Sequence, residues 1–531
     1  MQQLTGLDAA FLAMETPAVY GHVGSVCVLD PTTAPEPLTL PRLQQVVLSR
    51  LHLIPPFRRR LVEVPLGLDQ PYWIEDPDFD IEYHVRELAL PAPGDDRQLT
   101  EQAARLHSRP LDRTRPLWEL YLIGGLAGGR VAVYTKVHHA AIDGVSGNDL
   151  LAALLDRSPQ GRDLPPAPPW TCDEVPGSLA LLARSAVALT GQPLRAARMS
   201  AGLLRSLPAL AALPARPRLP VIEPVIDRLF GSHDDVVLPS PRLRAPATPF
   251  NRSISPHRRW AFRQLSMAEV KVIRSARELT VNDIVMALCA GALRRWLVDH
   301  DALPEQPLVA SVPVSVRAET EQGALGNRVS AMLATLPTHV ADPMERLRST
   351  HEAMRAAKEQ HGALPAALLA DVTQFAMPAL AGQAARLSAR LRLVERINPF
   401  NLIISNVPGP NVPLYYAGAE LLAYYPLSAI VDGQGLNITV FSYRGSLFFG
   451  LIADRDLVPD LERMATYIVD ELALLKDAVV GTSIAAPPAR AASSYPAEGS
   501  TLALSDPVRR HPTGPGRLSS PGASSPGSAR E

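Results

Sequence analysis

The sequence predicts a mixed fold of α-helices and β-strands that is divided into two domains. Segments such as His22–Leu29 and Val131–His138 follow the two-residue period of buried or half-buried strands. Other segments have apolar residues at helical spacing behind a capping box, as Thr280–Asp283 precedes Ile284–Trp296. A chain of 531 residues is too long for a single core, so two domains are expected. No internal repeat is visible.

In the first half, short helices and strands follow one another. The predicted helices are Leu4–Leu12, Leu40–Leu53 and Leu99–Leu106. The predicted strands are His22–Leu29, Tyr72–Pro77, Phe79–Val85, Arg115–Ile123 and Arg130–His138. The last two strands are expected to pair through the glycine-containing connection at Gly124–Gly129.

The second half begins near Pro249 and has the same mixed character. Capping boxes at Ser266–Glu269 and Thr280–Asp283 predict two helices, and further helices are expected at Pro343–Gln360 and after Asp460. The predicted strands are Leu308–Val316, one starting at Gly326–Ser330, Asn401–Ser405, and two or three between Leu427 and Asp454, with turns at Asp432–Gly433 and Arg444–Gly445.

Composition divides the chain into residues 1–160, a linker at 161–248, residues 249–480 and a tail at 481–531. The tail is rich in Pro, Ser, Gly and Ala, which predicts disorder. Within the linker, residues 177–218 contain six arginines and no carboxylate, with leucines between them. This segment fits peripheral contact with an anionic membrane or a lipid droplet. It fits equally well a pair of surface helices whose leucines pack on the protein.

Several classes of protein are disfavoured by composition. The net charge of −1 gives no field that would recruit nucleic acid. The three cysteines form no motif, and their odd number argues for a reducing cytoplasm. The N-terminus carries Asp8 and Glu15 and no basic start, unlike a signal peptide. No apolar run is long enough for a membrane span. A cytoplasmic protein, with peripheral membrane contact left open, is therefore expected.

The stretch from Val131 to Gly144 is the most informative for chemistry. In a strand, His138 and His139 point to opposite faces, and His139 continues the apolar face. An imidazole at the end of a buried strand, beside a turn, is well placed to act as a general base. Gly144 permits close backbone approach or a positive φ angle.

The histidine pair alone leaves alternatives open. A metal site is disfavoured, because adjacent strand residues diverge and no other His, Cys or Glu cluster has ligand spacing. A nucleophile elbow of the G-x-S-x-G type is absent from the sequence, which disfavours a histidine that activates serine. A base acting directly on a bound hydroxyl remains, against a core histidine that only bonds to backbone.

Motifs in addition to the pair carry a family resemblance. His138-His139-Ala-Ala-Ile-Asp143-Gly144 matches the H-H-x-x-x-D-G signature of coenzyme A-dependent acyltransferases. Pro116-Leu-Trp118, Asn282-Asp283 and Ser405-Asn406-Val-Pro-Gly-Pro410 follow in order, after an opening with Leu7-Asp-Ala-Ala-Phe-Leu, Glu15-Thr-Pro and His22-Val-Gly. From about Leu4 to about Val480, the chain resembles the bacterial wax ester synthase/diacylglycerol acyltransferases.

The resemblance implies two chloramphenicol acetyltransferase-like domains flanking a channel, with His139 near its middle. It also implies transfer of a long-chain acyl group from acyl-CoA, a co-substrate, to diacylglycerol or a fatty alcohol, without a cofactor or metal. Two other functions stay open. One is a sister activity on polyketide or glycolipid hydroxyls, and the other is a non-catalytic lipid-droplet protein.

The remaining motif residues each have two interpretations. Trp118 is a candidate for substrate contact, although a buried packing role suits a tryptophan better. Asn282 is a candidate for facing substrate, while the adjacent Asp283 fits a helix cap. Ser405 or Asn406 is a candidate donor to the developing oxyanion, although Asn406 would also serve to satisfy the turn.

The turn after His139 is expected to be held by charge. Asp143 is interpreted as architectural, and His138 as supporting. A buried carboxylate needs a cation or several hydrogen-bond donors. Arg317, which follows a predicted strand, is for this reason the candidate partner of Asp143.

Overall fold

The computed structural model of the protein describes residues 1–141, 147–170, 172, 174–185, 245–315, 329–362 and 398–484. These residues lie within one compact unit, Met1–Ile484. Its strands form two six-stranded sheets and one three-stranded sheet, and its helices pack on them. The predicted mixed α/β class with two sheet-rich parts is therefore confirmed.

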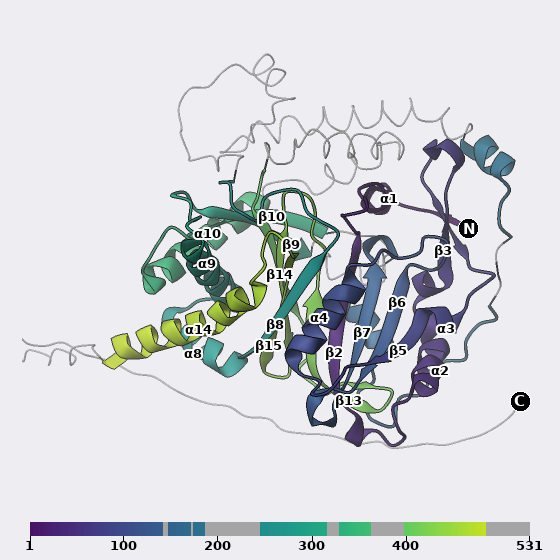
Figure 1. The fold of residues 1–531 in the computed structure, drawn as a ribbon, viewed down its shortest axis with the longest axis horizontal. Helices are drawn as coiled ribbons and strands as arrows, with labels where there is room; N and C mark the ends of the chain where they lie inside the picture. The colour runs from purple at the N-terminus through teal and green to yellow at the C-terminus, as the bar shows by residue number, and fades with distance from the viewer. Residues whose placement is uncertain are drawn as a thin grey trace, which may run out of the picture. The chain divides into compact units, whose positions relative to one another are not determined.

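The first large sheet has the strand order β12-β13-β2-β7-β6-β5 (Figure 1). Its strands are β12 (Tyr415–Tyr416), β13 (Ala419–Leu427), β2 (His22–Asp30), β7 (Val131–His138), β6 (Trp118–Gly124) and β5 (Val85–Ala89). β6 and β7 are the predicted antiparallel pair, and only β5 and β6 run parallel. Because β7 lies inside the sheet, seven of its eight residues are buried.

Two strands of this sheet come from the far end of the sequence. β13 pairs with β2 from Glu420, opposite Asp30, to Leu427, opposite Gly24. A register shift after Leu421 marks a bulge, which bends and twists the strand. The first sheet is thus completed by residues between 415 and 427. The domain limits at 160 and 249 remain a prediction.

Helices with sequence-encoded starts cover this sheet. α4 (Asp96–His107) opens with a capping box in which Asp95 and Gln98 exchange side-chain and backbone hydrogen bonds. It buries Leu99, Ala103 and Leu106, the i, i+4, i+7 stripe that a packed helix requires. α2 (Leu40–Arg50) starts behind Thr39, and the short α1 (Gly6–Ala13) starts behind Thr5.

The second large sheet has the strand order β10-β9-β11-β14-β15-β8 (Figure 1). Its strands are β10 (Val329–Leu336), β9 (Leu308–Ser315), β11 (Leu402–Pro408), β14 (Leu436–Tyr443), β15 (Ser446–Asp454) and β8 (Arg258–Ser266). β11 runs parallel to both of its neighbours, and the other pairs are antiparallel. β14 and β15 join at the predicted turn, where Arg444 and Gly445 have φ of 43° and 76°, as a tight two-residue hairpin turn requires.

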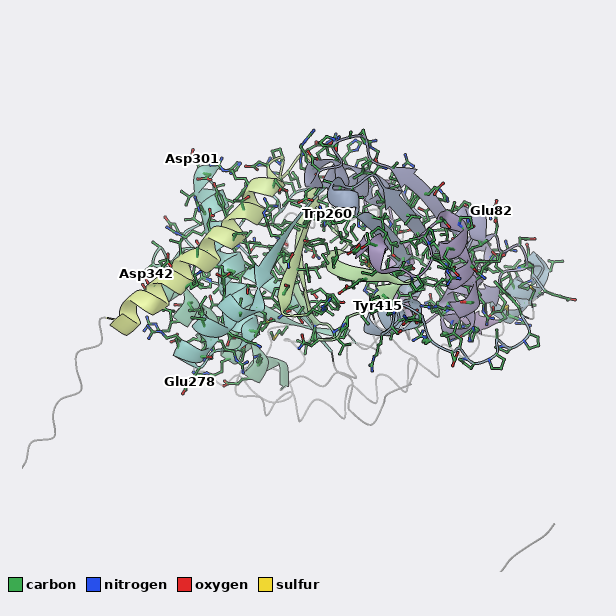
Figure 2. All side chains as sticks on the ribbon, turned by 90° about the horizontal axis from the view of Figure 1, so that it is seen from below. Glu82, Trp260, Glu278, Asp301, Asp342 and Tyr415 are labelled. Atoms are coloured by element: carbon green, nitrogen blue, oxygen red, sulfur yellow. The ribbon has the colours of Figure 1, made fainter. Side chains whose placement is uncertain are left out.

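One helix organises the layer on the second sheet. α9 (Val281–Asp299) contacts α8 (Met267–Arg277), α10 (Pro343–Gly362) and α14 (Leu461–Ile484). Thirteen of its residues are buried, on all sides of the helix, which is the pattern of a core helix. The chain turns back at Glu278 and Asp301, whose φ angles are 54° and 49°, and Asp342 caps α10 by accepting from the Glu345 N–H at 2.8 Å (Figure 2).

Direct contacts join the two large sheets. Trp260 of β8 donates from Nε1 to the Pro426 carbonyl of β13 at 3.3 Å. Arg258 donates to the Ala18 carbonyl, and its guanidinium lies 5.0 Å from the Tyr20 ring centre. Tyr415 forms a bridge with Asp156, so the connection after α5 (Gly147–Leu154) is also tied to the late strands (Figure 2 labels Trp260 and Tyr415).

Two local predictions need correction. Phe79–Val85 is not a strand, because Ile81–His84 forms the single-turn helix α3 before β5 begins. Asp80 caps this turn by accepting from the Glu82 N–H at 2.9 Å, which outweighs the apolar alternation. Ser266 does precede α8, but its side chain makes no capping hydrogen bond.

The remaining strands form a small sheet at the N-terminus. β4 (Tyr72–Glu75) lies between β1 (Gln2–Gln3) and β3 (Arg59–Val62). Among the helices of the described residues, none has the length and apolar content needed to cross a bilayer.

Candidate active site

The histidine pair lies at the end of β7, and its two rings have different surroundings. His138 is 1% exposed, whereas His139 is half-buried. The His138 Nδ1 accepts from the Ala140 N–H at 3.1 Å, so it carries a lone pair. Its proton is therefore on Nε2, which donates to Glu15 Oε1 at 3.1 Å. Both ring nitrogens of His138 are thus occupied in a buried network.

Glu15 is the anchor of that network. Its Oε1 also accepts from the Gly21 N–H at 2.8 Å, and its Oε2 accepts from Arg113 Nη2 at 2.7 Å. Burial alone would raise the pKa of this carboxyl. The hydrogen bonds from His138, Gly21 and Arg113 outweigh burial and lower the pKa from 4.5 to about 2. Glu15 therefore stays charged at any working pH.

His139 is held through its backbone and packed through its ring. Its N–H donates to the Gly21 carbonyl at 2.8 Å. Its ring stacks on Phe11 of α1, with ring centres 4.2 Å apart and planes 23° from parallel. α1 packs on the single turn His139–Ala141. The opening motif of the sequence thus forms a helix that positions the half-buried imidazole.

Three predicted residues lie outside the described part of the chain. They are Asp143 and Gly144 in the turn after His139, and Arg317 after β9. The proposed pairing of Asp143 with Arg317 therefore stays a prediction.

Trp118 is placed in the core of the first sheet. Its side chain is fully buried, and Nε1 donates to the Phe57 carbonyl at 2.9 Å. Its ring stacks on Phe57 and on His84, at 4.5 Å and 4.4 Å between ring centres. With every edge of the indole packed or hydrogen-bonded, we assign Trp118 to packing rather than to contact with substrate.

The structure brings two other predicted residues together. Asn406 of β11 donates from Nδ2 to Asn282 Oδ1 at 3.3 Å, which joins the strand to the start of α9. Asp283 next to it closes the capping box with Thr280 and accepts from His351 Nδ1 at 2.9 Å. The sequence predicted the cap contact of Asp283 with Thr280. It did not predict the contact with His351.

Ser405 and Asn406 face opposite sides of β11, because they are consecutive residues of a strand. Asn406 is on the side of Ile404, which packs in the core around α9. Ser405 is on the side of Val407, which packs against the core of the first sheet, and it lies beside Thr439 in the ladder. Of the two candidate donors, only Ser405 faces toward the half that carries His139.

A buried polar layer lies behind the histidine pair, between β7 and α4. The Lys136 side chain is fully buried and donates to Glu119 Oε2 at 3.1 Å and to the Arg109 carbonyl at 3.1 Å. Burial lowers the pKa of Lys136, and the Glu119 charge opposes that shift. His107 shares a hydrogen bond of 2.9 Å with the Tyr134 hydroxyl, and burial together with the Lys136 charge lowers the His107 pKa to about 3.

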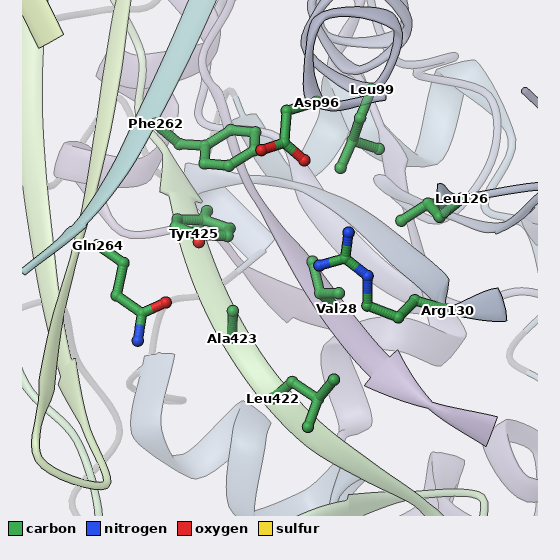
Figure 3. A pocket seen from close by; sticks show the side chains of 10 residues that line it. All are labelled: Val28, Asp96, Leu99, Leu126, Arg130, Phe262, Gln264, Leu422, Ala423 and Tyr425. Atoms are coloured by element: carbon green, nitrogen blue, oxygen red, sulfur yellow. The ribbon is translucent and has the colours of Figure 1, made fainter. Parts of the chain in front are cut away.

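Residues of α4, β2, β8 and β13 line a pocket (Figure 3). Its lining is Val28, Asp96, Leu99, Leu126, Arg130, Phe262, Gln264, Leu422, Ala423 and Tyr425. His139 lines neither this pocket nor the one beside Asn251 and Asn398. The predicted channel around His139 therefore stays a prediction.

The arrangement favours acid–base chemistry at His139. Its neighbour His138 is buried and bonded to Glu15 and to the backbone, whereas the His139 ring is half-buried and part of its surface is exposed. Within the described ranges, no group of three or more His, Cys, Asp or Glu side chains is arranged to hold a metal ion.

Sequence reasoning missed Glu15, Gly21 and Phe11 as members of the site. Phe11 and Glu15 lie in the opening motifs, and Gly21 directly precedes the His22 motif, but the sequence did not indicate what these residues contact. The spacing of Glu15 to His22 within one short loop was the available pattern. It could not indicate that the loop returns to the end of β7.

Comparison with known proteins identifies the family of the chain. Residues 4–285 match the model of the wax ester synthase/diacylglycerol acyltransferase catalytic domain, and residues 325–476 match the C-terminal domain of the same family. A probable diacylglycerol O-acyltransferase of Mycobacterium tuberculosis is 37% identical over 484 residues, which are 89% of this chain and 98% of the relative. The solved wax ester synthase/diacylglycerol acyltransferase of Marinobacter aquaeolei VT8 is 31% identical, with a TM-score of 0.62 over 90% of this chain and 100% of that one. The chain therefore belongs to the wax ester synthase/diacylglycerol acyltransferase family.

Proposed function

We propose that this protein transfers a long-chain acyl group from acyl-CoA to the hydroxyl of diacylglycerol or a fatty alcohol, forming triacylglycerol or a wax ester. The family supports the substrate class and the reaction. The observation that carries the catalytic assignment is the contrast in burial within the histidine pair: His138 is 1% exposed, whereas His139 is half-buried at the strand end.

In this mechanism, His139 takes the proton of the acceptor hydroxyl as its oxygen attacks the thioester carbon. A neutral imidazole with a pKa of about 6.5 cannot deprotonate a free alcohol beforehand, so proton transfer is concerted with attack. The new C–O bond forms, the C–S bond breaks, and the imidazolium returns the proton to the coenzyme A thiolate. A positioned base of this kind contributes about 10²–10⁴-fold.

The developing oxyanion needs a donor. Ser405 and Asn406 are the predicted candidates; Ser405 faces the half that carries His139, whereas Asn406 donates to Asn282 at 3.3 Å on the other side of β11. The scheme uses acyl-CoA as co-substrate and needs neither a metal nor a bound cofactor. Since both substrates bind at once, a ternary complex is expected and no acyl-enzyme forms.

Peripheral contact with a membrane or lipid droplet is part of the proposal. The argument is compositional: residues 177–218 combine arginines with leucines, and the acceptors are insoluble in water. Most of that segment, residues 186–218, lies outside the described residues.

The experiment is to incubate purified protein with palmitoyl-CoA and either hexadecanol or dipalmitoylglycerol, and to identify products by chromatography. Ester that appears only with an acceptor supports the proposal. A burst of thiol release without an acceptor would contradict the ternary mechanism. If both lipid acceptors are ignored while polyketide or glycolipid hydroxyls are acylated, the sister activity is correct. If no ester forms with any acceptor, the result favours a non-catalytic lipid-droplet protein.

A further inference from the structure

The loop between α1 and β2 delivers a carboxylate to the back of the histidine pair. Thr16 shapes this loop: its hydroxyl accepts from the N–H groups of Ala18 and Val19, at 3.2 Å and 3.1 Å. Glu15 is thereby directed toward the end of β7. Its side chain is 15% exposed, so the contacts it makes are shielded from water.

Two consecutive N–H groups after β7 are held by partners of Glu15. The His139 N–H donates to the Gly21 carbonyl at 2.8 Å, and the Ala140 N–H donates to His138 Nδ1 at 3.1 Å. Glu15 Oε1 accepts from both holders, from the Gly21 N–H at 2.8 Å and from His138 Nε2 at 3.1 Å. The Glu15 Oε1 atom therefore fixes Gly21 and His138, and these two residues accept from the N–H groups of His139 and Ala140.

The packing around this oxygen leaves little freedom. A Cβ built on Gly21 would lie 2.5 Å from His138 Nε2, far inside van der Waals contact. The absence of a side chain at this position is what lets the loop and the buried ring approach. Arg113 holds the other carboxylate oxygen and also donates to the Leu12 carbonyl at 2.6 Å, near the end of α1.

We propose that Glu15 is a positioning residue for acyl transfer: through Gly21 and His138 it fixes the backbone at His139, and so sets the direction of the catalytic imidazole. This inference rests on the proposed function, since it assigns the base to His139. Glu15 itself does not touch the substrate. Because reacting groups misplaced by about 1 Å lose on the order of 10²-fold in rate, a clamp on the backbone controls turnover.

The test compares two variants of Glu15 with a matched control. In Glu15→Ala, kcat is expected to fall by about 10²-fold. The KM for palmitoyl-CoA should change by less than about twofold, since binding is not the step lost. Glu63→Gln is the control, because Glu63 pairs with the same Arg113 at 3.5 Å but does not reach His138. It should keep kcat within about twofold.

Glu15→Gln tests whether the length of the side chain or its negative charge is what matters at this position. It keeps an Oε1 acceptor at the same distance for Gly21 and His138, so it should retain more than about a tenth of kcat. If Glu15→Ala does not fold, Glu15→Asp takes its place: it keeps the charge but is one methylene shorter. Under the proposal, Glu15→Asp loses more activity than Glu15→Gln, and the reverse order would overturn it.

Hydrogen exchange at His139 and Ala140, measured on the full chain, gives a readout independent of turnover. Faster exchange in Glu15→Ala, with no change in Glu63→Gln, supports the clamp. Unchanged exchange, or a folded Glu15→Ala with full kcat, overturns it while leaving the proposed function intact. A wild-type protein that makes no ester overturns the proposed function, and this positioning role with it.

Discussion

The two large sheets are covered by helices in similar ways, yet the interiors beneath those helices differ in chemistry. Around α9, the second sheet packs a large apolar cluster, and charge is buried there as an ion pair between Arg346 and Glu471 at 2.6 Å. Beneath α4, the first sheet buries a layer of ionisable and polar groups: His22, His107, Glu119, Tyr134, Lys136 and His138. The difference coincides with the site, since the polar layer ends at the histidine pair.

The polar layer carries a cost that apolar packing does not. Burial keeps His22 and His107 neutral, and the pKa of each is lowered far below its ordinary value. A core of leucines would stabilise the same space at no such cost. We interpret the layer as the support that fixes the rings and backbone at the end of β7, while the second sheet acts as a rigid scaffold.

The largest expected effect is on kcat, and it compares one partly exposed histidine from each half, His139 and His351. Removing the base in His139→Ala should lower kcat by about 10²–10⁴-fold. His351 of α10 is the competitor, because it pairs with Asp283 at 2.9 Å and looks like a second acid–base pair. His351→Ala should cost less than about threefold in kcat, because that contact belongs to the helix cap. Initial rates with palmitoyl-CoA decide the matter, and a larger loss in His351→Ala would reverse the comparison.

The next effect concerns the strand that links the halves. Ser405 faces the core of the first sheet and Asn406 faces α9. Only one of them can therefore donate a hydrogen bond to the oxyanion that forms beside His139. We expect Ser405→Ala to lower kcat by about 10²-fold, as loss of an oxyanion donor does. Asn406→Ala, which loses its contact with Asn282, should cost less than about tenfold.

Both variants would be assayed for kcat and for KM at saturating acceptor. An oxyanion donor acts in the transition state, so the loss in Ser405→Ala should appear in kcat and not in KM. Equal losses in both variants would mean that β11 contributes packing to the site and no donor.

Local sequence patterns predicted many of the helices, strands and turns of both halves. The period of β7, the capping box of Thr280 and the turn at Arg444 each depend on residues a few positions apart. The failure at Phe79–Val85 is also local, because alternation at Phe79, Ile81 and Tyr83 imitates a strand while Asp80 caps a helical turn.

The contacts that build the site are of another kind. Glu15 and His138 are 123 positions apart, and Asn282 and Asn406 are 124 apart. No periodicity reports such a contact, because it depends on how complete sheets and loops pack. The family resemblance indicated the histidine pair, and only the folded chain joins Glu15, Gly21 and His138 around one oxygen.

The smallest expected effect is on stability, and it belongs to the first sheet alone. The folded-state pKa of His107, about 3, lies below its unfolded value of about 6.5. Above pH 6.5 both states are neutral and the group has no effect. As the pH falls below 6.5, the unfolded chain takes up a proton that the folded chain refuses, so stability is lost. By pH 5 this single histidine costs on the order of 2 kcal/mol.

Urea unfolding at pH 7 and pH 5 measures this loss, in a range where Glu15, with its pKa of about 2, remains charged. His107→Gln should reduce the loss between the two pH values by about 2 kcal/mol, whatever its effect at pH 7. His257→Gln, at an exposed position, should leave it unchanged. If His107→Gln unfolds with the same pH dependence as the wild type, His107 is not the group that makes the first sheet sensitive to acid.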